Sequence, residues 1–194
     1  IKLLIFCSSL FFILLSIEVM LKFFPVSTGG HTMPLNEKHT LVCYKKNTTM
    51  ISSSGWRMKN KRTYHVNNYG FLNLEDYSNK ITQPILAIIG DSYVEAQQVS
   101  QKKTLYSILQ KKASQKFYVY SLARSFAPLS QYVKWAEFAH KEFNPQKMIF
   151  CIVGNDFDDS LAKYNKGPGY RYFIDQSEKQ LHIKRFDYEP GALK

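Results

Sequence analysis

The amino-acid sequence predicts an α/β fold built on a parallel sheet and preceded by an apolar N-terminal helix. Three short apolar runs recur at similar intervals, with helical patterns between them, which is typical of βαβ units. A long uncharged stretch, Leu3 to Ile17, lies close to the N-terminus. Polar residues of types that can take part in catalysis follow the first and third apolar runs directly.

We expect residues 1–24 to form a membrane anchor. A helix of about 20 apolar residues crosses a bilayer, and Lys2 to Phe24 provides this length if Glu18 and Lys22 lie at the interface. A cleaved signal peptide is a competing interpretation, but residues 23–26 lack the small residues of a cleavage site. A buried core helix is the third. We expect a single-pass protein with its domain on the extracytoplasmic side, because large domains translocate regardless of their charge.

Residues 25–80 are predicted to be a linker and an irregular lead-in. The stretch Ser27 to Pro34 is rich in Gly, Ser, Thr and Pro, which is typical of a boundary between segments. Gly70 lies in a turn-like sequence and suits a positive φ. The basic cluster from Lys59 to Arg62 is interpreted as a solvated loop, or as a contact for an acidic glycan or lipid head group.

The domain proper is predicted over residues 81–194. Its apolar runs are Ile85–Ile89, Phe117–Tyr120 and Met148–Val153. Runs without polar alternation favour parallel strands buried on both faces. Helical spacing joins Leu105 to Leu109, and a clearer apolar stripe extends from Leu129 to Phe143. Right-handed crossovers then give a three-layer, flavodoxin-like sheet, and Cys151 is expected to be a buried thiol in the third strand, although pairing with Cys43 is an alternative.

The carboxyl ends of parallel strands meet at one edge of a sheet, where α/β proteins bind ligands. The first strand is followed by Gly90-Asp91-Ser92, the second by Ser121 to Ser125, and the third by Gly154-Asn155-Asp156. A serine beside hydrogen-bond donors is what acyl transfer requires. Taken alone, the first motif is equally well explained as a turn with a helix N-cap, and the third as a loop with an Asx turn. Asp156, Asp158 and Asp159 are interpreted as a solvated helix start.

Residues 85–96, Ile-Leu-Ala-Ile-Ile-Gly-Asp-Ser-Tyr-Val-Glu-Ala, resemble the first block of the SGNH (GDSL-type) hydrolases, and Val153 to Asp156 resembles their third block. The lead-in is similar to that of membrane-anchored bacterial members. The resemblance implies that Ser92 is the nucleophile and an oxyanion donor, with Asp91 and Gly154 in support. It implies that Asn155 donates its amide to the same oxyanion. The family's second-block Gly is matched by Ala123, or in a shifted alignment by Ser125 or Phe126.

The family's Asp-x-x-His, which supplies the general base, has no match in this chain. None of the five histidines follows an aspartate at that spacing; they are His31, His39, His65, His140 and His182. A predicted hairpin near 170–186, with its turn at 175–179, resembles an insertion of anchored members and carries no base. We therefore expect the chain to be a C-terminally truncated, inactive piece whose base lies beyond Lys194.

Composition excludes several other classes of protein. With 45% apolar and 15% aromatic residues the chain is not disordered. The net charge of +11 does not predict nucleic-acid binding, because Arg is scarce and no recognition motif is present. Phosphate-binding loops and zinc-ligand spacings are absent, so no cofactor or metal is expected. The predicted function is an ester hydrolase or acyltransferase acting on an acylated envelope glycan or lipid; a non-catalytic envelope binding or scaffold protein is the alternative.

Overall fold

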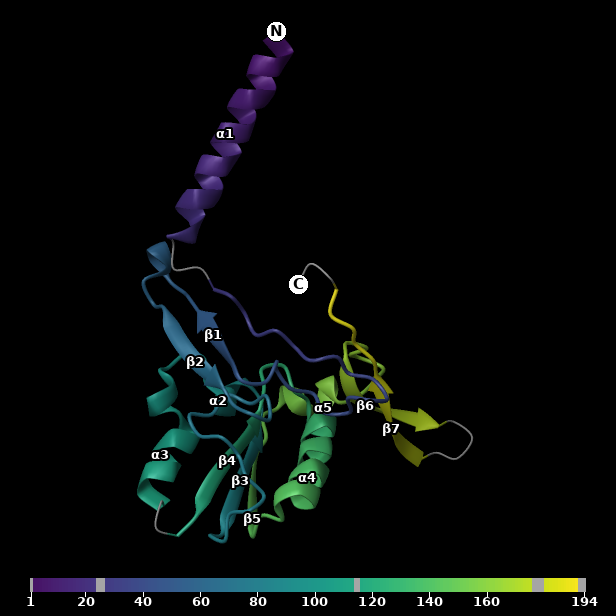
Figure 1. Ribbon diagram of the computed structural model, residues 1–194. Coiled ribbons are helices and arrows are strands. Elements are labelled where there is room, and N and C mark those ends of the chain that lie inside the picture. The colour runs from purple at the N-terminus through teal and green to yellow at the C-terminus, as the bar shows by residue number, and fades with distance from the viewer. Residues whose placement is uncertain (1, 24–26, 114–115, 176–179, 192–194) are drawn as a thin grey trace.

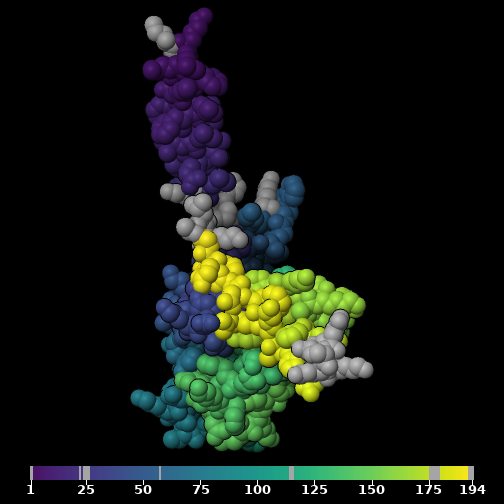
Figure 2. Space-filling model, turned by 90° about the vertical axis from the view of Figure 1, so that its right-hand side faces the viewer, coloured from purple at the N-terminus to yellow at the C-terminus, as the bar shows by residue number. Residues whose placement is uncertain are grey.

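The N-terminal helix stands apart from the rest of the chain. The computed structural model describes residues 2–23, 27–113, 116–175 and 180–191 (Figure 1). Helix α1, Lys2–Lys22, projects from one end of the molecule in both views (Figures 1 and 2). It is long and apolar enough to cross a membrane, and none of its apolar window is buried against the described part of the chain. This finding disagrees with the core-helix interpretation and leaves an anchor or a signal sequence.

A three-stranded parallel sheet forms the centre of the remaining chain, which confirms the predicted βαβ pattern. Its strands are β3 (Ile85–Gly90), β4 (Tyr118–Ala123) and β5 (Lys147–Cys151), in the order β4-β3-β5. The chain between β3 and β4 forms α2 (Ser92–Glu95), a 3-10 turn (Gln101–Lys103) and α3 (Leu105–Ala113), whereas α4 (Leu129–Phe143) connects β4 to β5.

Helices cover the two faces of this sheet, because successive side chains of a strand point to opposite faces. Ala87 and Ile89 of β3 face α4, in a core cluster that includes Tyr132 and Trp135. Leu86 and Ile88 face the other way and pack with residues of α2, α3 and β4; these are Val94, Tyr106, Val119 and Ala123. Helix α4 lies alongside the sheet (Figure 1), and its apolar stripe packs against it as its spacing predicts.

The lead-in is more ordered than the sequence suggests. Strand β1 (Thr48–Ser52) pairs antiparallel with β2 (Arg62–Val66), and the 3-10 turn η1 (Trp56–Met58) lies between them. Tyr64 of β2 is fully buried. Turn-forming and polar residues around these strands gave no sign of the pairing. β2 is held by distant residues, because the Tyr64 hydroxyl donates to the carbonyl oxygens of Gln97 and Val99, and the Gln101 side chain bonds to the backbone of His65. Gly70 has φ +86°, as predicted, and a Cβ there would lie 2.4 Å from the Tyr44 carbonyl oxygen.

Two findings concern the end of the chain. Strand β5 was expected to be buried on both faces, but its Ile149 and Phe150 are 43% and 42% exposed, because no described element covers them. The predicted hairpin is present as β6 (Gly169–Asp175) and β7 (Gln180–Phe186), paired antiparallel. Most of its predicted turn, residues 176–179, lies outside the described residues. Helix α5 (Asn155–Asp159) follows β5.

Candidate functional site

Ser92 lies on a sharp turn at the end of the central strand. Asp91 caps α2, and its Oδ1 accepts a hydrogen bond from the Tyr93 N–H at 3.0 Å. A Cβ on Gly90 would lie 2.3 Å from Val94 Cγ2, so the close packing of this turn requires glycine. The Ser92 side chain is half-buried, and its Oγ has one partner among the described residues, Asp91 Oδ2 at 3.4 Å. The hydroxyl is therefore positioned but only weakly bonded.

The strand register places the ends of β3, β4 and β5 side by side. Gly90 pairs with Ala123 on one side and with Cys151 on the other. The Arg124 N–H, one residue past β4, donates to the Gly90 carbonyl oxygen at 3.4 Å. Ala123 itself is buried as the last residue of β4. The loops that follow the three strands consequently start from one edge of the sheet.

Asn155 lies at the start of α5 with an exposed side chain. Its Nδ2 donates to Asp159 Oδ2 at 3.2 Å. The backbone of Gly154 is helical, and a Cβ there would meet nothing within 4 Å, so this glycine answers no steric demand of the described structure. Asn155 and Ser92 have no direct contact among the interactions of the described residues. The Asn155 amide has two N–H donors, of which one bonds to Asp159, so the second can serve an oxyanion.

Asp156 is buried, and its interpretation as part of a solvated helix start was wrong. Its Oδ2 accepts hydrogen bonds from the Tyr132 hydroxyl and the Val153 N–H, both at 2.9 Å. Burial raises the pKa of this carboxyl, and the charges of Asp91 and Asp159 raise it further. The carboxylate ties the end of β5 to α4, a tertiary role that an Asp-rich sequence does not reveal.

Glu95 holds the candidate site together, and its role was missed from the sequence. The side chain is 1% exposed. Its Oε1 accepts from the Tyr44 hydroxyl at 2.5 Å, and its Oε2 accepts from Gln97 Nε2 at 2.9 Å. The same Oε2 accepts from both the backbone N–H, at 2.8 Å, and the hydroxyl of Ser125. Glu95 thereby fixes the loop after β4 to the helix that begins with Ser92, and both to the lead-in.

The loop between β4 and α4 is strained where it leaves Glu95. Phe126 has φ +66°, a conformation that is a genuine outlier for a bulky residue. Its side chain is 91% exposed. Such strain persists only where the surroundings enforce it, and it is concentrated at functional sites. The Ser125 N–H, one of the alternative oxyanion donors, is already bonded to Glu95.

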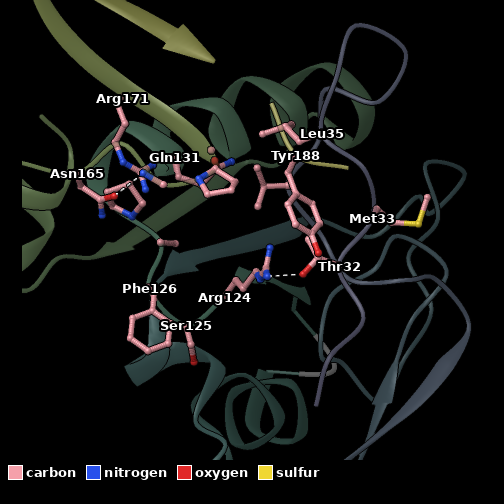
Figure 3. A pocket seen from close by; sticks show the side chains of 16 residues that line it. Thr32, Met33, Leu35, Arg124, Ser125, Phe126, Gln131, Asn165, Arg171 and Tyr188 are labelled. Carbon is pink, nitrogen blue, oxygen red and sulfur yellow. Dashed lines mark hydrogen bonds between the residues drawn. The ribbon is translucent and has the colours of Figure 1, made fainter. Parts of the chain in front are cut away.

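A cavity of about 410 Å³ opens beside this loop. Its walls come from the lead-in, the loop after β4, α4, the segment before β6 and Tyr188 (Figure 3). Arg124, Gln131 and Arg171 supply its polar groups together with Thr32 and Asn165, and no Asp or Glu of the described residues lines it. Ser92, Asn155 and Asp156 are not among the lining residues. The cavity was not predicted, because its residues are distant in the sequence and meet only in the folded chain.

The described residues contain no histidine bonded to Ser92 and no cluster of three His, Cys, Asp or Glu suited to a metal ion. His140 lies in α4 and His182 in β7, where its ring contacts Phe173. His65 lies 3.8 Å from Asp76. The general base of the predicted reaction therefore stays unassigned. In comparisons with known proteins, no family model and no curated protein matched this chain.

Proposed function

We propose that this protein is a membrane-anchored, SGNH-like ester hydrolase or acyltransferase with a flavodoxin-like sheet, acting on an acylated envelope glycan or lipid. The observation that carries the proposal is the position of Ser92, on a glycine-dependent turn after the central strand, at the edge where the ends of three parallel strands meet. The sequence resemblance around Ser92 and Asn155 supports it. Helix α1 would hold the domain at the extracytoplasmic surface of the membrane.

In the proposed reaction, Ser92 Oγ attacks the acyl carbon while a general base takes its proton. The carbonyl π electrons move to oxygen, and the resulting oxyanion is held by the Ser92 and Ala123 N–H groups and by the Asn155 amide. The C–O bond to the alcohol then breaks, and the alkoxide receives the proton from the base. Water, or a second hydroxyl in a transferase, next attacks the acyl-serine and restores Ser92.

A non-catalytic binding protein that retains this fold is the second candidate function. Two observations favour it. Ser92 Oγ has no basic partner among the described residues, and the cavity rich in polar groups is lined by none of the predicted catalytic residues. In this case the strand-end edge would be vestigial, and the cavity would carry the activity of the protein.

Replacement of the candidate nucleophile separates these two functions. We expect the protein expressed from its complete reading frame, purified in detergent, to hydrolyse p-nitrophenyl acetate and to be labelled by a fluorophosphonate. Ser92→Ala should lower turnover by about 100-fold or more and abolish labelling, since an activated serine is lost. Ser100→Ala is the matched control, because Ser100 is exposed and its side chain caps nothing. Equal turnover by the Ser92→Ala protein would contradict the hydrolase proposal; absence of turnover and labelling in the unaltered protein from the complete reading frame would favour the binding protein.

A further inference from the structure

The cavity beside the β4–α4 loop holds buried polar groups without partners. Gln131 is 1% exposed, and neither its Nε2 nor its Oε1 has a hydrogen-bond partner among the described residues. Arg171 is 3% exposed; its Nη1 donates to the Tyr170 carbonyl oxygen at 2.8 Å, but its buried Nε has no partner there. Unpaired buried polar groups oppose folding and are rare in native proteins. Three such atoms, from two side chains, meet in this cavity, where a bound ligand can satisfy them.

The charge of the cavity is positive. No carboxylate of the described residues lies within 4 Å of the Arg171 guanidinium, although Asp159 interacts with it at longer range. Burial lowers the pKa of Arg171, yet an arginine stays protonated in proteins. Arg124, on another wall, donates to Thr32 Oγ1 at 2.6 Å and lies 4.8 Å from the centre of the Tyr44 ring. The buried guanidinium of Arg171 requires an anionic partner.

Gly169 creates the space in which Arg171 and Gln131 meet. Its φ is +127°, and a Cβ at this position would lie 2.9 Å from Arg171 Nη1 and 3.6 Å from Gln131 Oε1. The two side chains therefore approach the same point from β6 and from α4. Figure 3 shows them gathered with Asn165, while Arg124 and Thr32 lie across the cavity.

We propose that this cavity binds an anionic sugar unit, in which a carboxylate or phosphate group lies beside free hydroxyls. The anionic oxygens would accept hydrogen bonds from Arg171 and from Gln131 Nε2, and a neighbouring hydroxyl would donate to Gln131 Oε1. Leu35, Pro128 and Tyr188 provide apolar surface for the sugar ring. The role of this unit as part of the substrate rests on the proposed function, whereas its binding does not, so binding is measured in the Ser92→Ala protein as well.

The test is calorimetric titration of the full chain in detergent with D-glucuronate, a glucose phosphate and neutral glucose. We expect at least one of the two anions to bind and glucose to bind about tenfold more weakly or worse, since charge-assisted hydrogen bonds are lost. The stronger of the two anions identifies the source as a uronate or as a phosphorylated sugar. The Ser92→Ala protein should bind the anions with unchanged affinity.

Two variants test the residues. Arg171→Met should lower the affinity for the anion about tenfold or more. Gln131→Met should lower it as well while raising the thermal midpoint, because an unpaired buried amide is replaced by an apolar side chain of similar shape. Arg185→Met is the matched control, since Arg185 lies outside the cavity and is paired with Asp187 at 2.6 Å.

The proposal is overturned if neither anion binds, if glucose binds as tightly as both anions, or if Gln131→Met leaves anion affinity unchanged. The last variant keeps the test decisive if Arg171→Met does not fold. A purely structural Gln131 would also show the opposite stability result, a lower thermal midpoint in the Gln131→Met protein.

Discussion

Strands β3 and β5 are similar in sequence and differ in their surroundings. Both are short apolar runs that end near a glycine, and they pair in register, with Ile88 opposite Ile149. Ile88 and Ile89 are fully buried, whereas Ile149 and Phe150 are 43% and 42% exposed. β3 lies between two strands and under helices on both faces, while β5 lies at the edge of the described sheet. An apolar run thus predicts a strand, but its burial depends on neighbours that the run itself does not specify.

The register pair Ile88 and Ile149 offers the largest contrast. Ile88→Ala should lower the free energy of unfolding by about 2–5 kcal/mol, because it leaves a cavity in a fully packed core. Ile149→Ala should cost about 1 kcal/mol or less, because the site is already half open to solvent. Urea unfolding followed by Trp135 fluorescence measures both, since Trp135 is fully buried. Similar losses for the two variants would mean that another element covers β5 in solution.

Cys43 of the lead-in, which lies in the same core cluster as Ala87 and Ile89 of β3, should respond to alkaline pH through its burial. Burial raises the pKa of Cys43 to about 11 from its ordinary value of 9.0. Because the folded-state pKa is the higher one, the protonated thiol stabilises the fold fully below pH 9.0, and this contribution is lost as pH rises toward 11. Unfolding at about pH 8 and about pH 11 should show the stability advantage of the unaltered chain over Cys43→Ala shrinking by about 2 kcal/mol.

Cys151 of β5 is the comparison for Cys43. It is only partly buried, and its pKa is raised by burial and by Asp91. We expect Cys151 to react with a thiol reagent in the folded chain faster than Cys43, in a Cys7→Ser background that removes the exposed third thiol. For Cys43, a difference in unfolding free energy between the Cys43→Ala and unaltered proteins that does not change with pH would contradict its raised pKa.

The smallest effect is expected from a charge on β5. Phe150→Lys should change the free energy of unfolding by less than about 1 kcal/mol, because the side chain is exposed. It should reduce self-association of the detergent-solubilised chain, since charged residues on an edge strand oppose pairing with another chain. Sedimentation velocity compares it with Tyr93→Lys, which adds the same charge at an exposed site outside the sheet. Equal effects of the two variants would show that net charge alone, and not the edge, controls association.

Local signals in the sequence predicted much of the fold. The apolar run of β3, the stripe of α4 and the glycine at position 70 follow from periodicity and backbone sterics. Glu95 was not predicted because its partners Tyr44 and Ser125 are distant in the chain. Gln131 and Arg171 were not predicted because they come from α4 and β6 and meet only in the folded chain. Asp156 likewise resembles a solvated residue in the sequence, because its partner Tyr132 lies 24 positions earlier in the chain. The strand-end position of Ser92 was predictable; the cavity beside the β4–α4 loop was not.

The attachment of the lead-in to β1 limits how far the domain can move from α1. Ser27 Oγ donates to the Ile51 carbonyl oxygen at 2.9 Å, and the Thr28 N–H donates to the same oxygen at 3.0 Å. Only four residues lie between Lys22, at the end of α1, and Ser27, so the two are at most about 17 Å apart even when the chain between them is fully extended. In a chain whose α1 spans a bilayer, this short connection keeps the domain close to the membrane surface. Molecules lying on the membrane surface are then always within reach, and those held farther away are not.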